Sequence, residues 1–499
     1  MSSFAAARAE AKARLRTVFG LAQYRPGQRQ AVETLLRGRD LIALFPTGAG
    51  KSLCYQLPAL CLPGVTLVVS PLIALMRDQV AHLRARGIPA ACLDSLQTPA
   101  ERAEVCRALA RGELKLLYAA PERLRAPGFA ELLTPCGVPL LVVDEAHCVA
   151  VWGESFRPDY REIGAFAASL PQRPVLCAMT ATADPRTLRA IRASLGLRRP
   201  VTVTLPLLRE NLRYALRPTL DTAAEAARLA AAHPGGRGVV FCGTRLRCER
   251  LADALRAKGF LAGFYHAGMA REARAEAQAR FAAGELRVLC ATSAFGMGVD
   301  IPDIRWVLHD SLPDSLMDLC QQSGRAGRDG LDADCVLAFR PEELLRQCRR
   351  LDAERERARR MLPRHPIQSA RALSALRRGT RSRQQVLDAV LGGGCIPQAL
   401  ARAFGQRIAP CGRCSACLDA VPLPERPPRL RGLDETGARR WVLRWQRDAA
   451  AASLGLAPEE VLPEARLALA ARTGRLEPGD GHPSAYPALK KLAEAMRRR

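Results

Sequence analysis

The chain has 499 residues, too many for one ordinary hydrophobic core, so roughly two to four domains are expected. Its 75 Lys and Arg against 49 Asp and Glu give a formal net charge of +26. A field of this sign attracts polyanions, so nucleic acid is the expected partner, although charge does not distinguish DNA from RNA. A coding bias toward arginine would raise the charge without implying any partner.

No stretch approaches the roughly 20 uninterrupted apolar residues that a membrane-spanning helix needs. The first residues also carry no apolar signal-peptide core. We therefore expect a cytoplasmic protein with no membrane partner. Most of the 17 Cys lie singly in apolar segments, which is typical of small buried side chains in a reducing compartment.

Short apolar segments alternate with amphipathic ones from residue 38 to about residue 345. This alternation is typical of buried parallel strands joined by crossover helices. It restarts after residues 199–216, so the sequence predicts an α/β protein with two such domains in tandem. The expected strands lie within residues 40–45, 65–71, 114–122, 139–147, 174–182, 235–244, 286–294, 304–312 and 334–340.

Beyond about residue 345 the pattern changes to long segments rich in Arg, Ala, Leu and Glu, which predict helices. The Pro-rich segment 421–432 is expected to be a linker, and no alternating-strand hairpin follows it. The expected divisions are residues 1–205 and 206–345 for the two α/β domains, 346–422 for a helical module, and 423–499 for the linker and a helical tail.

A candidate phosphate-binding loop, PTGAGKS, follows the first expected strand and leads into a helix. Gly48 and Gly50 would let backbone N–H groups surround a phosphate at the helix N-terminus. Lys51 would reach the β- and γ-phosphates, and Ser52 would coordinate Mg²⁺. The sequence therefore predicts ATP and Mg²⁺ as cofactors, although Phe45 stands where the general pattern has its first glycine.

The segment LLVVDEAHCV delivers Asp144 and Glu145 at the C-terminal end of an apolar strand, where α/β sheets place their sites. Asp144 would hold Mg²⁺ through water, and Glu145 would orient the attacking water. Arg325 and Arg328, on the Gly-rich turn QQSGRAGRDG, would supply positive charge to the γ-phosphate. Together with Lys51 they form the expected catalytic set.

The segment 411–417, CGRCSAC, places three thiols at CxxCxxC spacing. In a reducing compartment this spacing indicates a metal site more often than a disulfide framework. Zinc usually takes four ligands. Spacing alone leaves Cys348, His365 and Cys395 open as the fourth.

These motifs, in their order, resemble those of the RecQ family of superfamily 2 DNA helicases. The resemblance covers residues 19–418. It implies two RecA-like domains followed by a helical four-Cys zinc-binding module. It also implies an ATP-dependent DNA helicase that moves 3′ to 5′ on single-stranded DNA and unwinds duplexes in repair and recombination. The matching segments are FGLAQYRPGQRQAV, PTGAGKSLCYQLPAL, SPLIALMRDQV, AAPERL, DEAHCVAVWGESFRPDY, AMTATA, VVFCGTRLRCE, ATSAFGMGVDIPDIRWVLH and QQSGRAGRDG.

The resemblance implies further nucleotide contacts. Tyr24 and Arg25 would pack around the adenine, and Gln28 would bind its edge. Thr47, in the phosphate-binding loop, and Gln321, ahead of the two arginines, would complete the set.

The aromatic-rich segment after DEAH would sense single-stranded DNA and communicate with the ATP site. By composition alone, Trp152 and Phe156 would more often fill the core, but the resemblance favours stacking on bases, with Tyr160 nearby. The residues expected to bind DNA or to couple it to hydrolysis are His147, Trp152, Phe156 and Arg157.

The segment CIPQALARAFGQ resembles the family segment that carries the first zinc ligand. A closed, tetrahedral structural site is therefore implied. The upstream segment TRSRQQVL imitates the same pattern with Ser382 in place of a cysteine, which leaves a weaker three-thiol site as an alternative. The implied Zn²⁺ ligands are Cys395, Cys411, Cys414 and Cys417.

Two other functions stay open: an RNA helicase of the same superfamily, and an ATP-switched nucleic-acid translocase or clamp that separates no strands. About 80 residues follow Cys417, too few for both the winged-helix and HRDC modules common in the family, so a short form is expected, and its helical tail is either HRDC-like or a reduced winged helix. Expected partners are single-stranded DNA, tailed or forked duplexes, and single-strand DNA-binding protein or other repair proteins.

Overall fold

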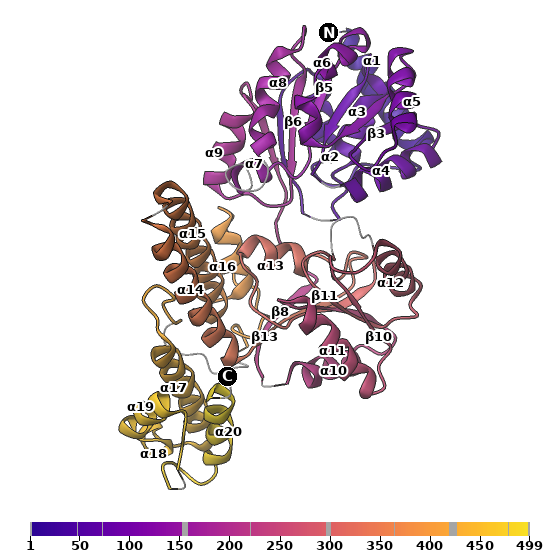
Figure 1. Cartoon of the computed structure of the whole chain (residues 1–499). Helices are drawn as coiled ribbons and strands as arrows, with labels where there is room; N and C mark the ends of the chain where they lie inside the picture. Colours follow the sequence, from indigo (N-terminus) through magenta and orange to yellow (C-terminus); the bar gives the residue numbers. More distant parts are fainter. Residues whose placement is uncertain are drawn as a thin grey trace. The chain divides into compact units, whose positions relative to one another are not determined.

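The computed structural model describes residues 2–46, 48–71, 73–151, 158–219, 221–295, 301–363, 365–418, 427–477 and 479–497. The chain forms two compact units, each built on a parallel sheet (Figure 1). One unit comprises Met1–Leu207 with Phe404–Gln406. The other comprises Leu208–Gly296, Ile301–Ala403 and Arg407–Arg499.

The first unit contains a seven-stranded sheet of order β3-β4-β2-β5-β6-β1-β7. Alternate residues of β1 enter different hydrophobic clusters: Ile42 and Leu44 join one, Leu41 and Ala43 the other. Both faces are therefore covered, which explains the continuous apolar strands. The strands are β1 (Leu41–Leu44), β2 (Thr66–Val69), β3 (Ala90–Leu93), β4 (Leu116–Ala119), β5 (Leu140–Val143), β6 (Val175–Thr180) and β7 (Val201–Thr204).

Helices cover this sheet, and local signals in the sequence begin several of them. Thr98 and Glu101 form a reciprocal capping box at the start of α5, and Asp184 caps α9 by accepting from the Thr187 N–H. The helices are α1 (Ser2–Thr17), α2 (Gln28–Leu36), α3 (Leu53–Cys61), α4 (Ile73–Ala85), α5 (Pro99–Ala110), α6 (Phe129–Leu133), α7 (Cys148–Val151), α8 (Ile163–Ser169) and α9 (Pro185–Ser194), with short 3₁₀ turns η1 (Pro121–Arg125), η2 (Thr134–Cys136) and η3 (Pro158–Glu162).

One short segment from far along the chain belongs to the first unit. The Gln406 carboxamide accepts a hydrogen bond from the Leu207 N–H and donates one to the Leu205 carbonyl, both at 2.9 Å. The Gln406 side chain thus satisfies the same backbone groups that a neighbouring strand would pair with. The two bonds fix the chain just after β7.

The second unit contains a six-stranded sheet of order β10-β11-β9-β12-β13-β8, and its strand pairs are parallel. Its strands are again almost wholly buried. They are β8 (Leu212–Pro218), β9 (Arg237–Phe241), β10 (Ala262–Tyr265), β11 (Val288–Ala291), β12 (Ile304–His309) and β13 (Ala333–Phe339).

After β13 the described residues are helical and contain no strand. The tail helix α17 packs on the end of the second sheet, where the ring of Phe339 lies 5.1 Å from that of Trp445. The helices of this unit are α10 (Thr222–Ala232), α11 (Arg245–Ala257), α12 (Arg271–Ala283), α13 (Leu316–Ser323), α14 (Pro341–Met361), α15 (Pro366–Leu391), α16 (Ile396–Ala403), α17 (Glu435–Leu454), α18 (Pro458–Val461), α19 (Glu464–Thr473) and α20 (Tyr486–Arg497).

The predicted fold class is confirmed: two parallel α/β sheets precede a helical region with a four-cysteine cluster. Every expected strand is present. Cys177, Cys290 and Cys335 are buried in strands, as predicted for small apolar side chains. Among the described residues, none of the helices has the length and apolar character to cross a membrane.

Candidate nucleotide site and metal centre

The phosphate loop, residues 46–52, connects β1 to α3. Gly48 and Gly50 have φ angles of 84° and 74°, in the left-handed region that glycine adopts without strain. Lys51 and Ser52 directly precede α3, and the Ser52 side chain makes no capping bond to the helix. The open N-terminus of α3 therefore offers backbone N–H groups to an anion. Thr47 lies outside the described residues.

The segment ahead of α2 holds the phosphate loop. The buried Gln28 donates from Nε2 to the carbonyl of Gly50 at 3.0 Å, and its Oε1 accepts from the Arg25 N–H at 2.8 Å. Arg25 in turn donates from Nη1 to the Gly48 carbonyl at 3.1 Å. The half-buried Tyr24 packs against the cluster between α1 and α3. The structure thus places Gln28 and Arg25 against the loop backbone, and their contact with adenine stays a prediction.

The strand β5 delivers two carboxylates at its C-terminal end. Glu145 has a φ of 48°, a strained conformation for a residue with a side chain, and such strain occurs often at functional sites. Burial and the nearby Glu145 raise the pKa of the Asp144 carboxyl, while the Lys51 ammonium opposes the rise. The structure therefore brings the acidic pair and Lys51 to one end of the first sheet.

The next residues link this acidic pair to β6. His147 is buried, and its Nδ1 lies 2.9 Å from the Thr180 Oγ1. Tyr160 is fully buried, and its hydroxyl donates to the Asp144 carbonyl at 3.4 Å. The Tyr160 ring therefore fills the core beneath the site and is not exposed for stacking on bases. Trp152, Phe156 and Arg157 lie outside the described residues.

The arginine loop, residues 324–330, follows α13 in the second unit. It carries Arg325, which is buried, and Arg328, which is half-buried. Gln321 lies on α13 just ahead of the loop. The Gly327 N–H donates to the Ile304 carbonyl at 2.8 Å, so the loop lies beside the start of β12. The structure thus gathers these three expected nucleotide contacts in one short segment.

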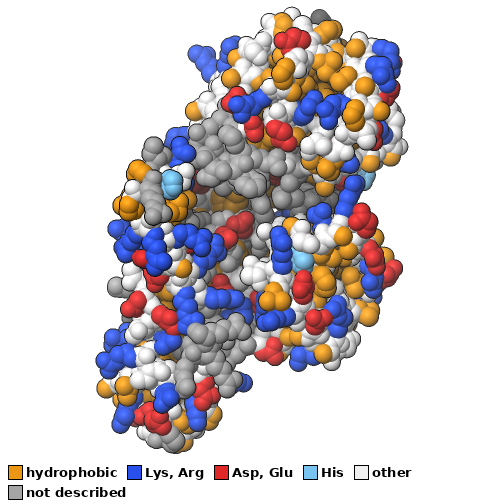
Figure 2. All heavy atoms as spheres, viewed as in Figure 1, with side chains coloured by type: hydrophobic (Ala, Val, Ile, Leu, Met, Phe, Trp, Pro, Cys, Tyr) orange, Lys and Arg blue, Asp and Glu red, His pale blue; other side chains and the backbone are white. Residues whose placement is uncertain are grey.

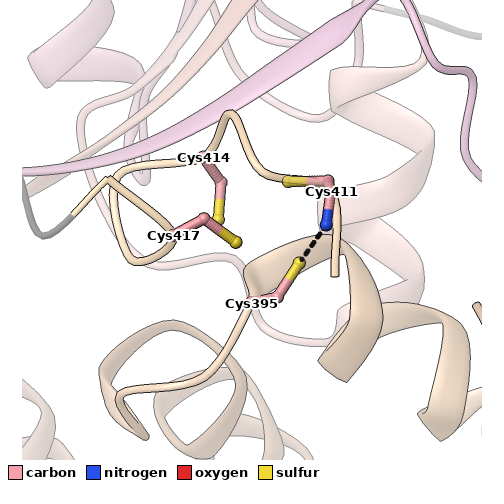
Figure 3. A group of neighbouring side chains, drawn as sticks. All are labelled: Cys395, Cys411, Cys414 and Cys417. Atoms are coloured by element: carbon pink, nitrogen blue, oxygen red, sulfur yellow. Dashed lines mark hydrogen bonds between the residues drawn. The ribbon is translucent and has the colours of Figure 1, made fainter. Parts of the chain in front are cut away.

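Four thiols converge in the helical region. Cys395 precedes α16, and the other three lie on the cysteine loop, residues 411–417 (Figure 3). The four sulfur atoms all lie within 4.8 Å of one another. The Cys411 N–H donates to the Cys395 Sγ at 3.2 Å, which joins the loop to the helix start. Neither Cys348 nor His365 is part of this group, whose fourth ligand atom is the Cys395 Sγ.

The donor set fits a tetrahedral metal. Zinc–sulfur bonds of about 2.3 Å place neighbouring sulfurs of such a site about 3.8 Å apart, so the observed group needs only a small contraction. Burial, which would raise the pKa of the Cys414 thiol, is outweighed by hydrogen bonds from the Ile396 and Cys417 backbone, and this pKa lies below its ordinary value. A thiolate, the form that binds metal, is therefore favoured at this position.

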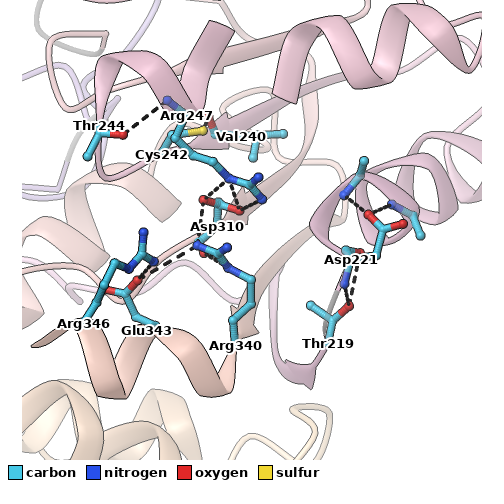
Figure 4. Close-up of polar contacts among 12 residues, drawn as sticks. Thr219, Asp221, Val240, Cys242, Thr244, Arg247, Asp310, Arg340, Glu343 and Arg346 are labelled. Carbon is cyan, nitrogen blue, oxygen red and sulfur yellow. Dashed lines mark hydrogen bonds and ion pairs between the residues drawn. The ribbon is translucent and has the colours of Figure 1, made fainter. Parts of the chain in front are cut away.

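A second polar group lies at the C-terminal ends of β9, β12 and β13 (Figure 4). The buried Asp310 accepts from Arg247 at 2.7 Å and from Arg340 at 3.2 Å. Arg346 and Arg340 also pair with Glu343. A pocket of about 330 Å³ borders these arginines. Asp310 and Glu343 therefore hold these arginines at the ends of the strands.

Two family models match the chain. The model described as DEAD/DEAH box helicase covers residues 25–191, and the model described as helicase conserved C-terminal domain covers residues 221–330. The matches fall on the first and second sheets respectively. They define the class of protein as a helicase core of two RecA-like domains.

Over about four fifths of its length the chain is similar to DNA helicases named RecQ. It is 38% identical over 406 residues to the ATP-dependent DNA helicase RecQ of Haemophilus influenzae, and this match covers 81% of the chain and 63% of the relative. It is 36% identical over 403 residues to the RecQ of Bacillus subtilis, covering 80% of the chain and 66% of the relative. The chain thus spans just under two thirds of the length of these relatives.

Solved structures share the fold at lower identity. The helicase Lhr of Mycobacterium smegmatis, bound to single-stranded DNA and AMP-PNP, matches with a TM-score of 0.56 and 19% identity, covering 94% of this chain and 74% of that one. The DUF1998 helicase MrfA, bound to DNA, matches with a TM-score of 0.58 and 21% identity, over 67% of this chain and 52% of that one. These likenesses establish the architecture alone.

Proposed function

We propose that the chain is an ATP-dependent DNA helicase that moves 3′ to 5′ on single-stranded DNA and separates duplexes, in DNA repair and recombination. One observation carries the proposal: Lys51, Asp144 and Glu145 converge at the phosphate loop of a chain similar to DNA helicases named RecQ. The names of the relatives, ATP-dependent DNA helicases, support DNA over RNA as the substrate.

The residues of the site have distinct roles in hydrolysis. Lys51 and the N–H groups of the phosphate loop bind the β- and γ-phosphates, and Glu145 orients the attacking water. Asp144 and Ser52 are the residues that would hold Mg²⁺, which supplies positive charge to the phosphates. Arg325 and Arg328, in the second domain, would act on the γ-phosphate. Bound ATP would then favour one arrangement of the two domains, and hydrolysis of ATP would remove that preference.

Binding of DNA is supported by the charge of α15. Figure 2 shows Lys and Arg side chains gathered over α14 and α15. The helix α15 contains five arginines and a single acidic residue, Asp388. Arg371, Arg377 and Arg381 are exposed, and none of the ion pairs in the described part of the chain involves them. Exposed cations without acidic partners are available to phosphates.

The four-cysteine cluster is proposed to hold a structural Zn²⁺. A closed four-thiolate site leaves no open position for chemistry, so the metal would stabilise the helical module and take no part in hydrolysis. The expected result is one zinc per chain in the purified protein, measured by elemental analysis.

The test of the helicase function uses matched DNA duplexes with a 3′ or a 5′ single-stranded tail, together with ATP and Mg²⁺. Unwinding of the 3′-tailed duplex alone, abolished by Lys51→Ala, is the expected result. ATP hydrolysis stimulated by DNA without unwinding of either duplex would instead support the translocase or clamp. Unwinding of an RNA duplex in preference to the matched DNA would support an RNA helicase.

A further inference from the structure

The chain between the two sheets binds the arginine loop. The guanidinium of Arg209 donates from Nη1 to the carbonyl of Gly327 at 2.7 Å. Its Nη2 donates to the carbonyls of Gly324 at 2.9 Å and Ala326 at 2.6 Å. One side chain therefore holds three backbone carbonyls of a single loop.

Asn211 holds the far end of the same loop. Its Nδ2 donates to the carbonyls of Gly327 at 2.8 Å and Leu331 at 2.7 Å. Gly327 has a φ of 56°, and a Cβ atom placed there would lie 2.5 Å from the Asn211 Nδ2. The loop thus approaches Asn211 so closely that only glycine fits.

The charged guanidinium of Arg209 binds only these carbonyls among the described residues. Among the described residues, no carboxylate forms an ion pair with Arg209. Charge-assisted bonds from a planar guanidinium are strong and demand a fixed geometry. Such bonds to backbone atoms define where the loop runs, whatever side chains it carries.

The cysteine loop binds the strand that continues from Asn211. The Ser415 N–H donates to the Tyr214 carbonyl at 3.1 Å, and the Ser415 Oγ accepts from the Leu216 N–H at 3.0 Å. Because β8 is an edge strand of its sheet, its free backbone groups need such a partner. Residues 209–216 therefore contact the arginine loop at one end and the cysteine loop at the other.

We propose that Arg209 and Asn211 are positioning residues for ATP hydrolysis, which fix the loop that carries Arg325 and Arg328, and that the four-cysteine module supports them through β8. This inference rests on the proposed ATPase function. An arginine that acts on a γ-phosphate contributes about 10³- to 10⁵-fold to turnover. A displacement of about 1 Å in a catalytic group can cost about 10²-fold.

The first test compares Arg209→Lys and Asn211→Ala with wild type. Lysine keeps the charge but lacks the fork that reaches three carbonyls. The matched control is Arg213→Lys, because Arg213 lies on the same segment and pairs with Asp334 at 2.9 Å instead of with the loop. We expect kcat for DNA-stimulated hydrolysis to fall about 10²-fold in the two variants, with the KM for ATP and the Kd of a fluorescent nucleotide unchanged.

A second variant separates positioning from general damage. In the Arg328→Ala background, Arg209→Lys is expected to change kcat by less than about twofold, since the two residues act as one unit. An unchanged kcat in the single variant would overturn the inference. A fall in kcat accompanied by an equal loss of nucleotide binding would also overturn it. So would a double variant in which the losses of kcat from Arg209→Lys and Arg328→Ala multiply.

Ser415→Ala tests the link to the cysteine loop while all four thiols remain. We expect kcat to fall while the zinc content of the protein stays unchanged, because the loop keeps its four thiols and loses the hydrogen bond from the Leu216 N–H. An unchanged kcat would sink this part of the inference. Zinc content serves as a readout that does not depend on activity.

Hydrogen–deuterium exchange distinguishes failure of this inference from failure of the proposed function. Peptides covering residues 321–331 should exchange faster in Arg209→Lys than in wild type and Arg213→Lys. Faster exchange in a chain that hydrolyses no ATP would reject the ATPase and retain the anchoring of the loop. If Arg209→Lys and wild type exchange equally and the wild-type protein hydrolyses ATP, only the anchoring of the loop is rejected.

Discussion

The Nδ1 atom of His147, in the segment that carries the acidic pair, lies 2.9 Å from the Oγ1 atom of Thr180 at the end of β6. Thr180 donates its own hydrogen to the Thr182 carbonyl at 3.0 Å, so it can only accept from His147. Burial lowers the pKa of His147, which favours the neutral ring with its hydrogen on Nδ1. The segment that carries the carboxylates is therefore joined to the end of β6 by a directed hydrogen bond from His147 to Thr180.

Removal of this bond should uncouple hydrolysis from DNA. Thr180→Val keeps the shape of the side chain and removes this acceptor, so the nearest one left to the buried His147 Nδ1–H is the Glu145 Oε2 atom at 3.4 Å; the loss of the bond costs about 1 kcal/mol in the free energy of unfolding. We expect basal ATP hydrolysis to persist and its stimulation by single-stranded DNA to fall several-fold. The measurement is the ratio of the two rates at saturating ATP.

Thr202→Val is the matched control, because Thr202 lies on β7 of the same sheet and accepts instead from Arg192. It should leave the ratio unchanged. Equal losses of basal and stimulated hydrolysis in Thr180→Val would contradict the coupling role, and would place this bond among the elements that support the catalytic set.

The sequence predicts the sheets well where apolar runs are continuous and bounded by motifs. It predicts β1, β5 and β6, for example, because each leads into or ends in one of the recognisable motifs PTGAGKS, DEAH and AMTATA. It does not predict β7 and β8 as separate strands of two sheets, since residues 199–216 form one mixed segment. Only the pairing of β7 with β1 and of β8 with β13 assigns them.

The candidate site follows the same division. The cysteines were foreseeable because their spacing carries the chemistry, and the structure brings together all four. The burial of Tyr160 was not foreseeable, because nothing in the neighbouring sequence distinguishes an exposed ring from one packed under a catalytic strand. The role of Arg209 is not predictable from the sequence for a related reason: its partners are backbone carbonyls more than a hundred residues away, which leave no trace in side-chain composition.

Asp40 should make the first domain sensitive to acid. Its carboxylate, 3% exposed, accepts from Arg173 at 2.8 Å and from the N–H groups of Leu176 and Arg198. Burial would raise the pKa of Asp40, but these bonds lower it below its usual value. A depressed pKa stabilises the fold fully above the unfolded value near 4, and this contribution is lost as the pH falls through the folded value.

Asp40→Asn should therefore lower the free energy of unfolding by about 3 kcal/mol near neutral pH, because it leaves the Arg173 charge without its partner. Urea unfolding at a series of pH values is the measurement. The difference from wild type should shrink below a pH of about 4. A difference that is constant with pH would show that the carboxylate charge contributes nothing.

Loss of one thiol should weaken the metal site. Cys414 is fully buried in the cluster, and Cys414→Ser replaces a thiolate by a poor zinc ligand. We expect the zinc content after dialysis against a chelator to fall well below one per chain, with a lower thermal midpoint. Ser382→Ala is the control, and it should match wild type in both. Zinc loss in that control would instead favour the three-thiol site.

The exposed arginines of α15 should account for part of the salt dependence of DNA binding. Each phosphate contact contributes about 0.7 to the slope of log K against log salt for single strands. The triple variant of Arg371, Arg377 and Arg381 to Ala should therefore weaken binding and reduce the slope by about 2. Binding of a labelled oligonucleotide, titrated with salt, measures both.

Arg350 and Arg360, on the neighbouring α14, provide the control because they already pair with glutamates at 2.8 and 2.9 Å. Their replacement by Ala removes similar exposed charge but should change the slope little, since a glutamate is freed with each cation lost. An equal reduction of slope for each arginine replaced, in both sets, would mean that only net charge matters. A reduction confined to the α15 set would place phosphates along that helix.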